Sequence, residues 1–106
     1  MPKGSVLVVD DALEMASTVV EFLQRHGFAA DGVDSAKRAL ERFRGAPVDV
    51  VLTDLRMKDM DGLDLLRAIR ELDPDVPVII MTAFGAVETA VEAIQRGAYH
   101  YVTKPF

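Results

Sequence analysis

The 106-residue sequence contains no cysteine and no tryptophan. Without cysteine the chain can form neither a disulfide framework nor a thiolate zinc site, and it has no cysteine nucleophile. Long apolar runs are missing as well. The run Val6–Val9 near the start is too short for the core of a secretion signal or for a membrane span. We therefore expect a cytoplasmic protein that does not insert into a membrane.

An excess of basic residues is also absent. The chain has 12 lysine and arginine residues against 17 aspartate and glutamate residues, which gives a formal net charge of −5 at pH 7. Because nucleic-acid backbones bind basic surfaces, we expect no direct nucleic-acid binding. Hydrophobic residues make up 50% of the chain, enough for one compact domain with its own core. We predict a single domain over residues 1–106.

The sequence does contain a regular alternation of predicted strands and helices. Three short apolar segments rich in β-branched residues are predicted strands: Ser5–Val9, Val48–Thr53 and Val76–Met81. Two weaker strands with partial alternation are predicted at Ala29–Val33 and Tyr99–Thr103. Four segments with helical periodicity lie between them: Leu13–Leu23, Ala36–Phe43 after the N-cap Ser35, Gly62–Leu72 and Ala86–Arg96. Strands joined by helical crossovers form parallel sheets with helices on both faces, so the predicted fold class is open α/β.

The chain stops at Phe106, shortly after the fifth predicted strand, and no residues are left for a helix after that strand. A doubly wound sheet needs helices on both faces. We therefore expect an uncovered apolar area beside the first helix, and a truncation or disorder beyond Phe106.

Polar residues follow the predicted strands at the edge where open α/β sheets bind ligands. Asp10 and Asp11 follow the first strand, and Asp54, Thr82 and Lys104 follow the third, fourth and fifth. Three converging carboxylates repel one another unless a cation lies between them, and all-oxygen ligation suits Mg²⁺. Asp54, on the middle strand, is the best-placed nucleophile, and Thr82 and Lys104 can stabilise a phosphoryl group in transfer. These residues favour Mg²⁺-dependent formation of an aspartyl phosphate.

Simpler structural explanations apply to each residue taken alone. An aspartate just before a helix, such as Asp11, is about as often an N-cap as a ligand. Asp59, Asp61 and Asp64 are expected to be loop and helix-start carboxylates. A lone threonine or lysine at a strand end is usually structural or solvated. The functional interpretation therefore depends on the joint placement of these side chains.

The segments VLVVDD, LTDLRMKDMDGLDLL, VIIMTA and YVTKPF resemble the receiver domains of two-component response regulators, over essentially the whole chain. The resemblance implies a flavodoxin-like (CheY-like) sheet of five parallel strands in the order 2-1-3-4-5. It implies that Asp54 accepts a phosphoryl group from a sensor histidine kinase. It also implies that Asp11 and Asp54 bind Mg²⁺ directly, that Asp10 binds it through water, and that Arg56 offers its backbone carbonyl.

The resemblance further implies a switch in which Thr82 moves toward the phosphoryl group while Tyr101 changes rotamer, with phosphorylation-dependent homodimerisation as its readout. The stretch TAFGAVETAVEAIQRGAYHYVTKPF looks most like receivers of the NtrC group, which precede an AAA+ ATPase and a helix-turn-helix domain in sigma-54-dependent transcription activators. The chain contains neither of these output domains. Beyond its own phosphorylation and dephosphorylation, the domain is not expected to be an enzyme.

Two residues depart from the usual receiver pattern. Lys58 stands in place of a proline and is expected to loosen the loop after Asp54 or to add a cation near the site. Ala12 stands where a third acidic residue is common. Three alternatives stay open: a flavodoxin-type cofactor module, which Asp10 and Asp11 disfavour by repelling phosphate, a phosphohydrolase, which Ala12 disfavours, and a degenerate receiver, which the intact set of site residues disfavours.

Overall fold

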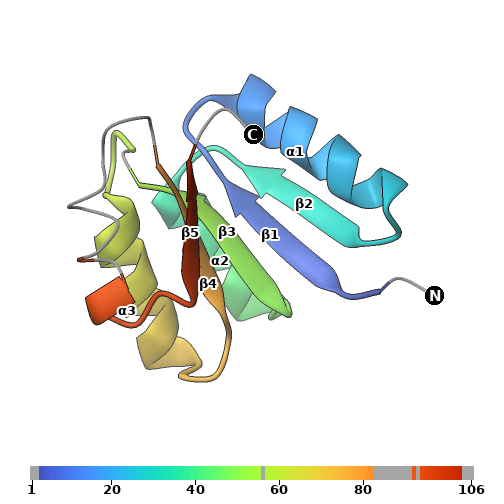
Figure 1. The fold of residues 1–106 in the computed structure, drawn as a ribbon. Helices are drawn as coiled ribbons and strands as arrows, with labels where there is room; N and C mark the ends of the chain where they lie inside the picture. The colour runs from blue at the N-terminus through green and yellow to red at the C-terminus, as the bar shows by residue number, and fades with distance from the viewer. Residues whose placement is uncertain (1–2, 56, 83–91, 93, 104–106) are drawn as a thin grey trace.

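The structure is a computed structural model of the chain and describes residues 3–55, 57–82, 92 and 94–103. Its centre is a five-stranded parallel sheet in the order β2-β1-β3-β4-β5 (Figure 1). The strands are β1 (Ser5–Val9), β2 (Ala29–Val33), β3 (Val50–Asp54), β4 (Val78–Thr82) and β5 (His100–Thr103). The predicted fold class and strand order are confirmed.

Three helices join the first four strands: α1 (Leu13–Arg25), α2 (Ala36–Gly45) and α3 (Gly62–Leu72). The predicted helix Ala86–Arg96 lies mostly outside the described residues, and of it residues 92, 94 and 95 are helical. Gly97 follows with a φ of 107°, a left-handed conformation typical of a glycine that ends a helix. None of the helices in the described part of the chain is long and apolar enough to cross a membrane.

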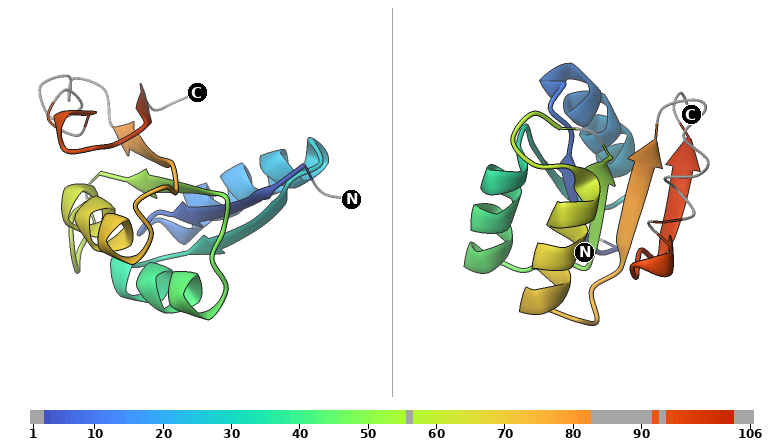
Figure 2. Two further views of the ribbon diagram at one scale, coloured as in Figure 1. Left: turned by 90° about the horizontal axis from the view of Figure 1, so that it is seen from below. Right: turned by 90° about the vertical axis from the view of Figure 1, so that its left-hand side faces the viewer.

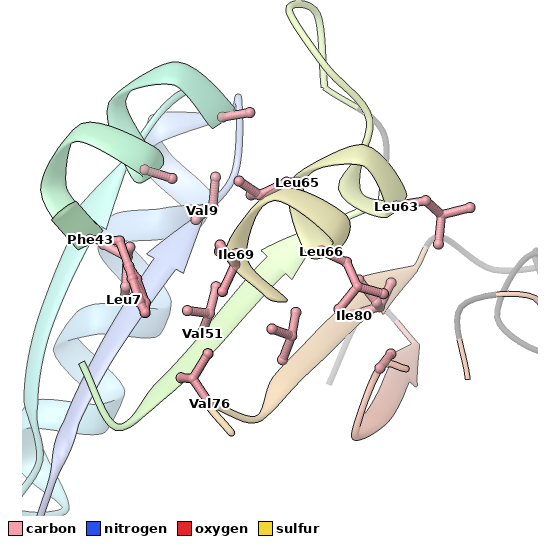
Figure 3. Packing of buried hydrophobic residues seen from close by; sticks show 14 of the residues in the cluster. Leu7, Val9, Phe43, Val51, Leu63, Leu65, Leu66, Ile69, Val76 and Ile80 are labelled. Carbon is pink, nitrogen blue, oxygen red and sulfur yellow. The ribbon is translucent and has the colours of Figure 1, made fainter. Parts of the chain in front are cut away.

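The helices form two layers around the sheet. Helices α2 and α3 lie side by side on one face, and α1 covers part of the other (Figure 2). Because successive side chains of a strand point to opposite faces, Leu7 and Val9 of β1 pack toward α2 and α3, while Val6 and Val8 pack toward α1. Among the described residues, the first core holds 16 buried residues and the second holds six. Figure 3 shows part of the first core, where Leu65, Leu66 and Ile69 of α3 lie beside Val9 and Val51 of the sheet.

The face that carries α1 includes apolar side chains that are only half-buried among the described residues. Val50, Leu52 and Val102 point toward this side and are only half-buried. On α1 itself, Leu13 and Phe22 are 54% and 60% exposed. Apolar surface therefore reaches solvent on this side of the described structure.

The bounds of the elements follow the predictions with small shifts. Strands β1 and β2 and helix α3 have the predicted bounds, and α1 and α2 each extend two residues further. The predicted starts of β3 and β4, at Val48 and Val76, are wrong, and each strand begins two residues later. Both valines are nevertheless buried, because the chain enters the core before it joins the sheet. The predicted start of β5 at Tyr99 is one residue early.

The connection from β3 to α3, residues 55–61, begins next to Asp54, and its two ends lie close together. The backbone N–H of Gly62 donates to the carbonyl oxygen of Leu55 at 2.6 Å. A Cβ atom on Gly62 would lie 2.5 Å from the carbonyl oxygen of Asp54, so only glycine fits at this position. The start of α3 is therefore packed directly against the end of β3.

Candidate functional site: an acidic cluster at the end of β1 and β3

The ends of β1 and β3 bring three carboxylates together. The two strands pair in parallel with Val9 opposite Thr53, so Asp10 and Asp54 each follow directly after this pair. One carboxylate oxygen from each of Asp10, Asp11 and Asp54 lies within 4.8 Å of the others. The structure thus assembles three of the predicted site residues into one cluster.

The three carboxylates differ in exposure. Asp10 is buried, with 1% of its surface exposed, whereas Asp54 is half-buried and Asp11 is exposed. The Oδ1 atom of Asp10 accepts a hydrogen bond from the N–H of Ala12 at 2.9 Å, and the N–H of Asp10 donates to the carbonyl of Val33 at 3.1 Å. Asp10 is therefore the buried member of the cluster, held by hydrogen bonds, and Asp11 is its solvent-exposed member.

The structure tests the helix-capping explanation of Asp11. The N-cap of α1 is Ala12, and no side chain caps this helix within the described part of the chain. The N–H of Ala12 is instead bound by Asp10. Capping of α1 therefore does not account for Asp11, whose carboxylate lies in the acidic cluster with Asp10 and Asp54.

The backbone around Asp54 is held on both sides. Asp54 lies opposite Met81 of β4, and the N–H of Leu55 donates to the carbonyl of Met81 at 3.0 Å. The hydroxyl of the fully buried Thr53 donates to the carbonyl of Asp54 at 3.1 Å. Thr53 is a contributor that the sequence analysis does not identify; its signal is a polar residue at the end of an apolar strand.

The other predicted site residues are described only in part. Thr82 ends β4 one residue after Met81, and only its backbone is described. Tyr101 of β5 lies opposite Ile80 of β4, and its half-buried side chain packs against the first core. The remaining two residues, Arg56 and Lys104, lie outside the described residues.

The donor set of the cluster suits a hard divalent cation. Carboxylate oxygens are the ligands that Mg²⁺ and Ca²⁺ prefer, and Mg²⁺ usually takes only one or two of them and keeps several waters. Oxygens within 4.8 Å of one another can share such a hydrated ion, directly or through water. A cation would also relieve the repulsion among three negative charges.

Asp59, in the connection after Asp54, has a different environment. Its Oδ1 accepts from the N–H of Ala36 at 3.2 Å, and its Oδ2 accepts from the N–H of Lys37 at 3.0 Å. The hydrogen bond from Lys37 lowers the pKa of Asp59 below its ordinary value, desolvation partly opposes this effect, and the hydrogen bond from Ala36 adds to it. Asp59 is thus a loop carboxylate, as predicted, but it caps a helix more than 20 residues away.

A hollow of about 360 Å³ lies along α3 and contains none of the predicted site residues. It is lined by Leu63, Asp64, Arg67, Arg70 and Arg96. Arg70 donates to the carbonyl of Val76 at 3.3 Å, and Arg96 pairs with Glu92 at 2.7 Å. Two of its three guanidinium groups therefore have partners within the chain, and we assign it no function.

Comparison with known proteins agrees with this geometry. The family model of the response regulator receiver domain matches residues 6–106. The chain is 43% identical over 100 residues to the transcriptional regulatory protein ZraR of Escherichia coli K12, covering 94% of this chain and 23% of that protein. It is 42% identical over 106 residues to the DNA-binding transcriptional regulator NtrC of Proteus hauseri, covering 100% of this chain and 22% of that protein. The chain thus spans less than a quarter of the length of these relatives.

A solved structure shows the same fold. The crystal structure of the receiver domain of NtrX from Brucella abortus matches with a TM-score of 0.92 and 35% identity, covering 95% of this chain and 86% of that chain. The match decides against a flavodoxin-type cofactor module and against a phosphohydrolase. With the strand order, the acidic cluster and the family model in agreement, this chain belongs to the response regulator receiver domain family.

Proposed function

We propose that this chain is a phosphoacceptor module in which Asp54 receives a phosphoryl group from a sensor histidine kinase. The observation that carries the proposal is the convergence of Asp10, Asp11 and Asp54 within 4.8 Å, in a chain of the receiver family. Asp54 is half-buried, so its carboxylate has a fixed backbone and an accessible side. Both properties suit a nucleophile that reacts with a group on another protein.

The proposed reaction moves one phosphoryl group. A carboxylate oxygen of Asp54 attacks the phosphorus of a phosphohistidine, and an O–P bond forms as the N–P bond breaks. The imidazole nitrogen keeps the bonding electron pair and is protonated. Asp54 then carries a mixed anhydride, which water later hydrolyses to the carboxylate and inorganic phosphate. The chain promotes only these reactions of its own side chain.

Asp10, Asp11 and Asp54 would hold Mg²⁺, with the backbone carbonyl of Arg56 as a further ligand. When bound, the cation neutralises charge on the carboxylates and on the phosphoryl oxygens. Asp10 is oriented for this role by its hydrogen bond from Ala12, and Asp11 is accessible to a hydrated ion. Beside them, the Lys104 ammonium would pair with the phosphoryl charge, and the Thr82 hydroxyl would donate a hydrogen bond to it.

Phosphorylation would be transmitted through Thr82 and Tyr101, with a phosphorylation-dependent homodimer as the readout. Tyr101 is half-buried against the first core, so a change of its rotamer would alter the surface around β5. The relatives ZraR and NtrC are named transcriptional regulators, and this chain matches less than a quarter of each. We therefore propose that the receiver controls a transcription activator of the NtrC group in the cytoplasm.

The proposal is tested with acetyl phosphate and Mg²⁺, with the product measured by intact mass. The wild-type chain should gain one phosphoryl group, and Asp54→Asn or an excess of EDTA should abolish the gain. Asp64→Asn removes an exposed carboxylate from α3 and should leave the adduct unchanged. A wild-type chain that binds Mg²⁺ but forms no adduct would instead be a degenerate receiver that serves only as an interaction module.

A further inference from the structure

The connection between β3 and α3 is anchored to the core along most of its length. At one end Leu55 is bound to β4, and at the other Gly62 closes back onto Leu55. Between these ends, Met57 and Met60 are half-buried against the first core. Among the described residues of the connection, Lys58 and Asp59 at its tip are exposed, as is Asp61 just before α3. Burial therefore does not hold the tip in place.

Asp59 supplies the missing anchor by capping α2. The first two amides of this helix, Ala36 and Lys37, donate to the two carboxylate oxygens of Asp59 at 3.2 and 3.0 Å. The third amide, Arg38, donates to the hydroxyl of Ser35 at 3.1 Å. Helix α2 has no acidic residue in its own first turn, and the Asp59 carboxylate complements its dipole from outside the helix.

Helix α2 is a firm anchor for this contact. Its residues Ala36, Ala39 and Phe43 are buried in the first core, beneath the same sheet that carries Asp54. A carboxylate bound by two adjacent amides of such a helix has little freedom to move. The contact thus joins the segment after β3 to the segment after β2 at the carboxyl-terminal edge of the sheet, where the acidic cluster lies.

We propose that Asp59 is a positioning residue for the acidic cluster: by capping α2, it fixes the connection that follows Asp54 and prearranges its backbone for cation binding. The inference rests on the proposed function of Asp54. Without the Asp59 carboxylate the tip would sample more conformations, and cation binding would have to order it. The expected loss is about threefold to tenfold in Mg²⁺ affinity, in line with the usual effect of one helix cap.

The experiment compares Asp59→Ala with Ser35→Ala as a matched control. Both variants remove a cap from α2, but the hydroxyl of Ser35 is bound by an amide of its own helix, whereas the Asp59 carboxylate joins the helix to the connection. Mg²⁺ affinity is measured by calorimetry, stability by urea unfolding, and the amides of α2 and residues 55–62 by hydrogen exchange.

We expect Asp59→Ala to weaken Mg²⁺ binding about threefold to tenfold and to speed exchange of the amides of both Lys37 and Gly62. Ser35→Ala should lower stability similarly but leave Mg²⁺ affinity within about twofold of the wild type. Equal effects of the two variants on Mg²⁺ affinity would reduce Asp59 to an ordinary helix cap and overturn the proposal. If the wild-type chain bound no Mg²⁺, the proposed function would fail with it, and the exchange data would still show whether Asp59 holds the connection.

Discussion

Among the glycines in the described part of the chain, Gly62 is the one where an added Cβ atom would come closest to other atoms. A Cβ atom there would lie 2.5 Å from the carbonyl oxygen of Asp54 and 2.9 Å from the Cα of Leu55. Both are backbone atoms, so no side-chain rotation can relieve the contact. The requirement for glycine therefore arises from the close approach of α3 to the end of β3.

We predict that Gly62→Ala lowers the free energy of unfolding by about 1–3 kcal/mol, because the backbone next to Asp54 must shift. Gly45→Ala is the control, since a Cβ atom at Gly45, the last residue of α2, meets nothing within 4 Å. That variant should be neutral or more stable by up to about 1 kcal/mol, because alanine favours helix. Urea unfolding measures both, and a Gly62→Ala chain as stable as the wild type would refute the close approach.

Three aspartates show what can and cannot be predicted for single residues from the sequence. The alternation of strands and helices is sufficient to place Asp10 and Asp54 at one edge of the sheet, because parallel strands end on the same side. The partner of Asp59 could not be predicted in this way. Its contact with Ala36 and Lys37 depends on how two connections meet in space, and helix-capping patterns in sequence concern residues within one turn.

At the scale of the element, α2 shows how a short helix depends on its N-terminus. Its ten residues are too few for a stable helix in isolation, so packing and capping must supply the difference. Asp59 and Ser35 together satisfy the first three amides. The capping contribution of Asp59 requires its charged form, which is the form that the lowered pKa favours.

We predict that Asp59→Ala destabilises the chain by about 0.5–1 kcal/mol at neutral pH, the lower part of the capping range because the site is exposed. Since the pKa of Asp59 is lowered in the folded state, this stabilisation is fully present well above pH 3.8 and is lost as the pH falls through the lowered value. The difference between wild type and variant should therefore shrink in acid. Urea unfolding at pH 7 and pH 3 measures it.

The control for this pH dependence is Ser35→Ala, which removes an uncharged cap from the same helix and should differ from the wild type by the same amount at both pH values. The nearby ion pair of Asp34 with Arg38, at 3.2 Å, is unchanged in all three chains and cancels in the comparison. A difference between Asp59→Ala and the wild type that did not vary with pH would mean that the carboxylate charge does not contribute.

The shifted starts of β3 and β4 have one physical cause. Val48 and Val76 continue the apolar runs of the strands, and both are buried. Hydrophobicity reports burial, whereas a strand also requires a neighbour for its backbone hydrogen bonds. The residues just before β3 and β4 are buried but are not part of either strand. The apolar pattern alone therefore places the strand starts too early.

At the scale of the whole molecule, the stability of the fold is expected to depend on whether a cation is bound to the acidic cluster. The chain has a net charge of −5, and three of its carboxylates lie within 4.8 Å of one another. Their repulsion opposes folding when no cation is bound. A cation that binds only the folded cluster stabilises the fold, by about 2.7 kcal/mol at one hundred times its dissociation constant.

We predict that Asp11→Asn stabilises the metal-free chain and reduces the stabilisation that Mg²⁺ provides. In EDTA it should raise the free energy of unfolding by up to about 1 kcal/mol, the energy of two unit charges about 4 Å apart in water. Saturating Mg²⁺ should raise the free energy of unfolding of this variant by less than it raises that of the wild type. Glu41→Gln, on the exposed side of α2, removes the same charge away from the cluster and should change neither quantity. Destabilisation of Asp11→Asn in EDTA would contradict the prediction.

The unequal cores on the two faces of the sheet have a consequence for how the domain opens. Among the described residues, 16 buried side chains join α2 and α3 to the sheet, whereas six join α1 to its face. Partial unfolding is therefore expected to start with α1, while the opposite layer and its connection to Asp54 stay closed. The layer of α1 is thus expected to adjust its packing more easily than the layer of α2 and α3, which keeps the carboxylates in place.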